Sequence, residues 1–275
     1  LGAGAARVGL REGTVNRSPF PRRAGVGAAL VAGAGIGGAG DPRRASAARK
    51  PSLAALARVT QGRLITPGSS RYNVARQVVN ARFSGARPLA VLQARNAQDV
   101  RQAVLWCARN GVRITARSGG HSYAGYSTLN GGLVVDLSAL NGIRLSSDRR
   151  TVQAGAGGDL INFYTALARR GLTVPGGSCP TVGLGGLALG GGVGMASRAL
   201  GTTSDNIVAM TVVTADGQVR SCDRRTNPDP FWACRGAGPS THLTLATARG
   251  CAVSVVPSIL KTTGTASQTP SHRRL

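Results

Sequence analysis

The stretch RSGGHSYAG, residues 117–125, places one of the three histidines of the 275-residue chain inside a run of glycines. Residues 112–116, directly before it, alternate between apolar and polar, which predicts a strand that ends at this stretch. Glycine accepts positive φ angles and has no Cβ, so the backbone of such a loop can come close to a ligand. The stretch therefore predicts a loop at a strand end, with His121 as its candidate functional residue.

Two further glycine-dense loops follow, GGSCPTVGLGG at residues 176–186 and GGGVG at residues 190–194. Backbone N–H groups in such loops form concave sites for phosphate oxygens, although a single loop of this kind more often marks a turn. Alone, His121 fits a packed or surface histidine, and Cys179 fits a small buried hydrophobe. Both can form covalent bonds, however, and each lies in a different glycine loop, which favours a cofactor site.

The spacing of apolar residues indicates a mixture of helices and strands. Cys107 falls on the apolar face of one predicted helix and is expected in the core, and the Asp216–Gly217 pair predicts a hairpin turn. Because the elements follow no strict βαβ rhythm, the pattern favours the α+β class. Helices are predicted from Asn96 to Gly111 and over residues 160–168, and strands over residues 132–138, 151–154, 207–214 and 218–222.

The composition excludes some classes of function. The net charge of +24 comes from 34 basic residues, of which only two are lysines. This preference for arginine over lysine is typical of a genome-wide codon bias. The basic residues are spread along the chain without a basic stripe interleaved with aromatics, so nucleic-acid binding is not expected. The five cysteines lack CxxC spacing, so no zinc site is expected.

Residues 24–40 form an apolar, glycine-rich run near the N-terminus. Gly33, Gly35 and Gly38 match a dinucleotide fingerprint, but Asp41 and Pro42 interrupt any following helix. An arginine pair before the run and an Ala-x-Ala site at residues 45–47 resemble a twin-arginine signal peptide, without its usual phenylalanine and leucine. We expect a secreted or extracytoplasmic protein, with a disordered basic leader as the alternative, and no stable membrane insertion.

Six motifs give a specific resemblance. They are RSGGHS at 117–122, PGGSCPTVGLGG at 175–186, GGGVGMASRALG at 190–201, SDNIV at 204–208, ADG at 215–217 and NPDPFWACRGAG at 227–238. In order and spacing, they resemble the berberine-bridge-enzyme-like FAD-linked oxidases of the vanillyl-alcohol-oxidase superfamily. The resemblance implies a PCMH-type FAD-binding domain, made of two α+β subdomains with the flavin between them.

The resemblance also implies a role for individual residues. His121 would be linked to the 8α-methyl carbon of the flavin and Cys179 to ring carbon 6, so the FAD would be bicovalent. Val182 would sit where the family controls oxygen access, with core packing as an equal interpretation. Asp205 fits a cofactor contact or a turn residue equally well. The diphosphate would be held by Arg117, Ser118, Gly119, Gly120, His121, Ser122, Gly125 and Ser127, the ring by Gly176, Gly177, Val182, Gly183, Gly185 and Gly186, and the remaining cofactor by Gly194, Asp205, Asn206 and Ile207.

The resemblance covers residues 71–241, which we expect to form two subdomains at about 71–145 and 146–241. Residues 1–47 are expected to be the leader and 48–70 a linker. Residues 242–275 diverge and are rich in Ser, Thr and Pro, so we expect a disordered tail. A frameshift, a premature stop or a wrong gene model would explain this divergence and the expected absence of a substrate domain. Because the family's base comes from that domain, no catalytic base is nominated.

We expect an FAD-dependent oxidase that takes a hydride from an alcohol, sugar or secondary metabolite and passes the electrons to O2, giving H2O2. No metal is expected. The alternatives are a flavin-binding remnant without activity, a nicotinamide-binding protein built on residues 33–38, and a basic nucleic-acid binder.

Overall fold

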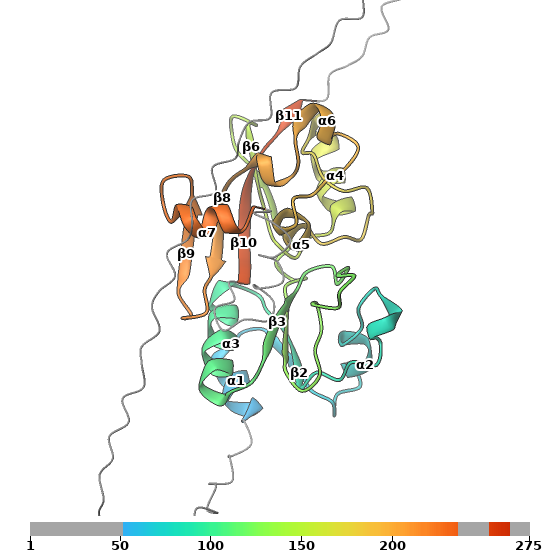
Figure 1. The fold of residues 1–275 in the computed structure, drawn as a ribbon, viewed down its shortest axis with the longest axis vertical. Helices are drawn as coiled ribbons and strands as arrows, with labels where there is room; N and C mark the ends of the chain where they lie inside the picture. The colour runs from blue at the N-terminus through green and yellow to red at the C-terminus, as the bar shows by residue number, and fades with distance from the viewer. Residues whose placement is uncertain (1–51, 236–252, 265–275) are drawn as a thin grey trace, which may run out of the picture. The chain divides into compact units, whose positions relative to one another are not determined.

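The structure is a computed structural model that describes residues 52–235 and 253–264. The predicted leader at 1–47, including the glycines at 33–38, lies outside the described residues. The motif end at 236–241 lies outside them as well. The described elements form two main sheets, each with its own buried core (Figure 1).

The first sheet has the strand order β1-β2-β4-β3, in which β2, β4 and β3 are parallel and β1 is antiparallel to β2. Helices α1 and α3 lie together on one face (Figure 1), where Leu92 and Val135 point into the same core as Leu56. Val91 and Val134 point to the opposite face and pack with Tyr72 of α2. The elements are α1 (Leu53–Val59), β1 (Arg63–Ile65), α2 (Tyr72–Ala75), η1 (Ala81–Phe83), β2 (Ala90–Gln93), α3 (Ala97–Asn110), β3 (Ile114–Arg117) and β4 (Leu133–Asp136).

Helix α3 confirms the prediction made from its ends and its apolar spacing. The Asn96 side chain accepts a hydrogen bond from the Asp99 N–H at 2.9 Å, which satisfies a free amide of the first turn. Gly111 ends the helix with φ of 63°, a conformation that glycine adopts without strain. Cys107 is buried in the core, as expected from the helix face.

The second sheet is antiparallel, with the order β5-β6-β10-β8-β9. The predicted turn at Asp216–Gly217 joins β8 to β9, and Gly217 has φ of 75°. Phe163 and Leu167 of α4 pack in the core of this sheet. The elements are β5 (Ile143–Leu145), β6 (Thr151–Ala154), α4 (Leu160–Ala168), β7 (Leu172–Thr173), α5 (Leu184–Leu189), α6 (Ser197–Leu200), η2 (Ser204–Asn206), β8 (Ile207–Val213), β9 (Val219–Asp223), α7 (Pro228–Ala233), β10 (Val253–Lys261) and β11 (Thr263–Gly264), which pairs with β7.

The structure places helices or strands in two segments that were predicted to be a linker and a disordered tail. The linker expected at 48–70 contains α1 and β1, and Leu56 is fully buried, because α1 packs against α3. The tail expected to be disordered contains β10 and β11 at residues 253–264. Proline is unusual in a central strand because it lacks an N–H to donate. In β10, Pro257 lies where the register with β8 shifts, between Val256 and Ile259, as expected for a proline at a bulge. Residues 242–252 and 265–275 of that tail lie outside the described residues.

Candidate functional site

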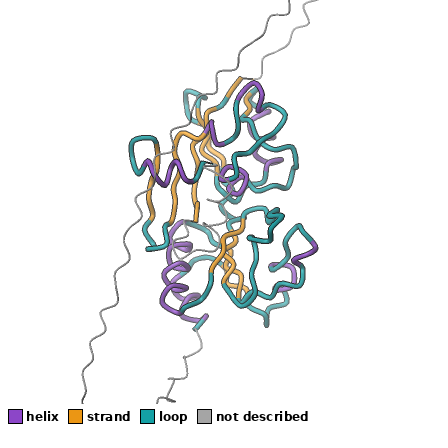
Figure 2. Tube along the Cα trace, viewed as in Figure 1, coloured by secondary structure: helices purple, strands orange, loops and turns teal. Residues whose placement is uncertain are grey.

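The loop after β3 and the loop before α5 meet backbone to backbone; Figure 2 shows both as loops. A Cβ built on Gly183 would overlap Ser118 Oγ and the Gly119 nitrogen, and one built on Gly119 would overlap the Gly183 nitrogen. Ser118 Oγ also donates a hydrogen bond to the Ala156 carbonyl at 2.5 Å. Both positions need glycine because any side chain would force the two loops apart.

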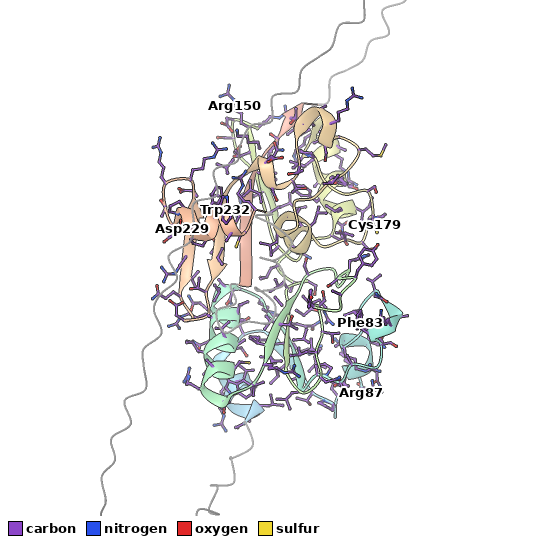
Figure 3. All side chains as sticks on the ribbon, viewed as in Figure 1. Phe83, Arg87, Arg150, Cys179, Asp229 and Trp232 are labelled. Atoms are coloured by element: carbon purple, nitrogen blue, oxygen red, sulfur yellow. The ribbon has the colours of Figure 1, made fainter. Side chains whose placement is uncertain are left out.

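This contact brings His121 and Cys179 to one place, although they are far apart in the sequence. The Thr181 hydroxyl lies 2.9 Å from His121 Nε2 and 4.0 Å from Cys179 Sγ. His121 is half-buried, and Cys179 is exposed on the loop before α5 (Figure 3). The His121 imidazole and the Cys179 thiol therefore both lie near the Thr181 hydroxyl group.

The third glycine loop packs on the second. A Cβ on Gly194 would overlap the Gly176 carbonyl, and Thr203 Oγ1 donates to the Pro175 carbonyl at 2.8 Å. The Tyr164 hydroxyl of α4 donates to the Gly177 carbonyl at 2.8 Å, and partial burial raises the pKa of Tyr164. The second loop is thus held from both sides, by α4 and by the third loop.

The first two loops present backbone N–H groups with no internal partner. The amides of residues 119–122 donate to no other residue within the described part of the chain, and the same holds for residues 176–179. Consecutive free N–H groups in glycine loops form concave sites for anions such as phosphate. The backbone N–H groups of these two loops therefore suit a diphosphate better than the side chains of the same loops do.

The side chain of Arg117, which was predicted to contact the diphosphate, is engaged within the protein. Its side chain is buried, with Nε 3.1 Å and Nη2 2.5 Å from Asp136 Oδ2. The guanidinium group also donates to the carbonyls of Gln77 at 3.0 Å and of Ala75. Because these partners use the guanidinium group, it is not available to a cofactor and instead anchors the base of the first loop.

The end of the first loop is also held by protein contacts. Gly125 has φ of 78°, and a Cβ there would lie 2.5 Å from the Phe83 ring, which Figure 3 labels. Ser122 Oγ accepts a hydrogen bond from the Tyr126 N–H at 3.1 Å. Ser127 is half-buried, and its side chain has no hydrogen bond to another described residue. Gly125 is therefore needed for the turn and for packing on Phe83.

The positions predicted to line the ring divide into two groups. A Cβ on Gly185 would lie 2.8 Å from the Ala156 carbonyl, whereas a Cβ on Gly186 would meet nothing within 4 Å. Val182 packs against the core of the second sheet, and its carbonyl accepts from the Leu160 N–H at 3.0 Å. Gly186 thus faces open space. Val182 packs on the core, which is one of the two interpretations that its sequence position allowed.

The segment before β8 is built by local hydrogen bonds. Asp205 Oδ2 accepts from the N–H and the hydroxyl of Thr202, both at 2.8 Å, and these bonds lower the pKa of the Asp205 carboxyl. Asn206 Nδ2 donates to the Leu200 and Thr202 carbonyls, each at 2.9 Å. Ile207 is buried in the core. Asp205 therefore acts as the turn residue that the sequence allowed.

The sequence reasoning missed Thr181 and the contact made by Tyr164. Thr181 was inside a quoted motif, but nothing in its spacing distinguished it from a loop residue. Two cavities of about 370 and 480 Å³ lie away from the glycine loops and share Arg95 and Ala139 in their linings. Within the described residues no group of His, Cys, Asp and Glu is arranged to hold a metal. No described helix is long and apolar enough to cross a membrane.

Comparison with known proteins identifies one domain type. The family model described as an FAD binding domain matches residues 88–223. The FAD-linked oxidoreductase pynB of Aspergillus niger is 38% identical over 191 residues, which cover 70% of this chain and 35% of that protein. The (R)-6-hydroxynicotine oxidase of Paenarthrobacter nicotinovorans is 39% identical over 183 residues, 66% of this chain and 39% of that protein.

Solved structures show the same fold. The BBE-like 1 protein of Physcomitrella patens aligns with a TM-score of 0.68 and 35% identity, over 76% of this chain and 43% of that chain. A glucooligosaccharide oxidase of Acremonium strictum, described as having a 6-S-cysteinyl, 8α-N1-histidyl FAD, aligns with a TM-score of 0.68 and 27% identity, over 77% and 42%. The chain spans less than half the length of these relatives.

Proposed function

The chain carries the FAD binding domain of the FAD-linked oxidoreductases, an α+β domain of the PCMH type, and from this we propose that it holds one FAD through covalent bonds to His121 and Cys179. The observation that carries the proposal is the Thr181 hydroxyl, which lies 2.9 Å from the imidazole and 4.0 Å from the sulfur. Two side chains able to bond to one ring system are thereby held at one site.

The surrounding residues fit FAD. The N–H groups of residues 119–122, which donate to no described residue, suit the negative charge of the diphosphate, and a Cβ on Gly186 would meet no described atom within 4 Å. Cys179 is exposed, so its thiol can be reached. Arg117 is left out of this binding set because Asp136 and the backbone already use its guanidinium group.

Each covalent link requires an oxidant. Forming the bond removes a hydrogen from the imidazole nitrogen or the sulfur and another from the flavin carbon, as two protons and two electrons. We propose that O2 takes up these electrons and is reduced to H2O2. The two links fix the ring in place and tune its oxidising strength, since the protein adjusts chemistry that belongs to the cofactor.

For the whole reaction, we propose that FAD held at His121 and Cys179 would supply the acceptor for a hydride from a C–H bond of a small alcohol, sugar or secondary metabolite, with O2 as the final electron acceptor. The names of relatives support this class of substrate, among them 6-hydroxynicotine oxidase and a xylooligosaccharide oxidase. A flavin holder without turnover is the alternative; the chain covers 39% and 42% of these two proteins.

The test of the tethers is mass spectrometry of the full chain produced with ample riboflavin. We expect one FAD per chain, with flavin on the tryptic peptides that contain His121 and Cys179. His121→Ala combined with Cys179→Ala should abolish attachment, whereas the control Cys107→Ala should retain it. Unmodified peptides at both positions would overturn the proposal.

Turnover is tested separately on the flavin-loaded chain. Peroxide release over a panel of alcohols, sugars and amines supports the oxidase, whereas a loaded chain that releases none supports the holder without turnover.

A further inference from the structure

We propose that Thr181 is a positioning residue for the covalent attachment of FAD, and that its hydroxyl orients the imidazole ring of His121. The inference rests on the proposed function and goes beyond it, because it assigns a role to a residue outside the predicted binding set. Thr181 Oγ1 lies 2.9 Å from His121 Nε2, within the range of a good hydrogen bond.

The backbone on both sides of Thr181 is fixed. The Pro180 carbonyl accepts from the Ile161 N–H and the Val182 carbonyl from the Leu160 N–H, both at 3.0 Å. These two donors belong to the first turn of α4, whose residues Leu160 and Phe163 are buried in the core of the second sheet. Thr181 therefore lies in an exposed turn whose flanking carbonyls are both held by the first turn of α4.

The first loop is held against the same residue. A Cβ on Gly119 would lie 2.7 Å from the Thr181 carbonyl, so the backbone that carries His121 lies close to the backbone of Thr181. The hydrogen bond between the two side chains thus joins two segments that already touch. It requires little further ordering of the His121 backbone.

The chemical consequence concerns the two ring nitrogens. A neutral imidazole has one N–H and one nitrogen with a lone pair, and a hydrogen bond at one nitrogen fixes the role of the other. When Nε2–H donates to the Thr181 oxygen, Nδ1 carries the lone pair and can form the bond to carbon. In this arrangement, in which the Thr181 hydroxyl is the acceptor, Nε2 is occupied and Nδ1 is left to form the link.

The same hydroxyl affects Cys179 less. Its distance to the Cys179 sulfur is 4.0 Å, and sulfur is a weak hydrogen-bonding atom. Loss of the hydroxyl should accordingly slow the His121 link much more than the Cys179 link. This difference distinguishes positioning of one ring from general damage to the loop.

The test follows attachment over time in the full chain refolded with FAD, with each link isolated in its own background. In Cys179→Ala protein, where His121 is the single tether, Thr181→Val should slow attachment about 3- to 10-fold, as expected for one hydrogen bond. Thr181→Ser should stay within about twofold of Thr181, since it keeps the hydroxyl. In His121→Ala protein, Thr181→Val should change the rate of the Cys179 link by less than about twofold.

Two further measurements exclude a merely structural effect. NMR of the proteolytic flavin peptide should show a single linked nitrogen, Nδ1, in the parent and the Ser variant, and a mixture with Nε2 in the Val variant. Thr165→Val, on the exposed side of α4, is the matched control and should behave as the parent. Melting temperatures of all variants show whether the fold is kept.

The outcomes separate this inference from the proposed function. One outcome is a parent chain that attaches flavin normally while Thr181→Val attaches it at the same rate and through a single nitrogen. That result overturns the role of Thr181 and leaves the tethers standing. Equal slowing of both links also overturns it. A parent chain without attached flavin overturns the tethers and this inference together.

Discussion

At the residue scale, Arg117 and Asp136 form a buried ion pair between the ends of β3 and β4. The side chains of both are nearly inaccessible, and two backbone carbonyls accept further hydrogen bonds from the guanidinium group. Removing one partner of such a pair leaves the other buried and uncompensated, which costs about 3–5 kcal/mol. The pair therefore sets the position at which the first glycine loop begins.

We expect Arg117→Gln to lower the free energy of unfolding by about 3–5 kcal/mol, because Asp136 would be left without its ion pair. Urea denaturation followed by circular dichroism measures this change. Arg198→Gln is the matched control at an exposed arginine and should stay within about 0.5 kcal/mol of the parent. Equal stability of the two variants would contradict the structural role of Arg117.

The cysteines should differ strongly in reactivity. Burial raises the pKa of Cys107 to about 12, so at pH 8 it is almost entirely the unreactive thiol. Cys179 is exposed. In flavin-free protein at pH 8, we expect iodoacetamide to modify Cys179 well before Cys107, as followed by peptide mass spectrometry. Loading with FAD should protect Cys179, and unchanged labelling after loading would argue against its tether.

The placement of residues was predictable where chemistry and motif coincide, and the covalent roles of His121 and Cys179 stay predictions. The sequence identified His121 and Cys179 as a pair and Cys107 as a core residue. It did not reveal the partner of Arg117, because Asp136 lies on a different strand and only the parallel pairing of β3 with β4 places Arg117 opposite Asp136. The contact of Thr181 with His121 depends in the same way on the packing of two separate loops.

At the element scale, the glycine loops work through close backbone contact. Gly119 and Gly183 face each other so closely that neither accepts a Cβ, while Gly186 in α5 has open space around its Cα. The same residue type thus serves packing at two positions and leaves space at the third. The sequence pattern alone could not separate these uses.

We expect Gly183→Ala to destabilise the protein by about 1–3 kcal/mol, because its methyl group would overlap Ser118 and the Gly119 backbone. Gly186→Ala should instead be neutral or stabilising by up to about 1 kcal/mol, since alanine favours a helix and meets no atom. Thermal unfolding of both variants measures the difference, and destabilisation by Gly186→Ala alone would contradict the geometry.

The helices and strands with clear local signals were predicted correctly. Asn96 and Gly111 bound α3, the Asp216–Gly217 turn joins β8 and β9, and α4 follows its apolar spacing. Helix α1 and strand β10 were not predicted. Helix α1 has only seven residues, and β10 contains a proline, so local signals are weak or contrary in both.

At the scale of the whole molecule, β10 completes the second sheet. It pairs with β6 on one side and β8 on the other, and Leu260 is fully buried. The strand at 253–261 therefore joins two segments that are far apart in the sequence, 151–154 and 207–213. Strand β10 is thus the central strand of the second sheet.

We expect a chain ended after Thr241 to lose its folded second sheet, because β6 and β8 would lose their shared partner. A chain ended after Gly264 keeps β10 and β11 and should fold as the parent does. Size-exclusion chromatography and circular dichroism distinguish the two outcomes. A monodisperse, cooperatively unfolding chain after the shorter truncation would contradict the central role of β10.

The amino-acid sequence alone predicted the α+β class from short-range periodicity, and the FAD binding domain and the grouping of His121 with Cys179 from motifs. The tertiary structure alone decided that Arg117 is an anchor, that Thr181 contacts His121 and that β10 is the centre of a sheet. These features are contacts between distant segments, and their geometry is set by strand pairing and by the closeness of glycine backbones, which no local pattern encodes.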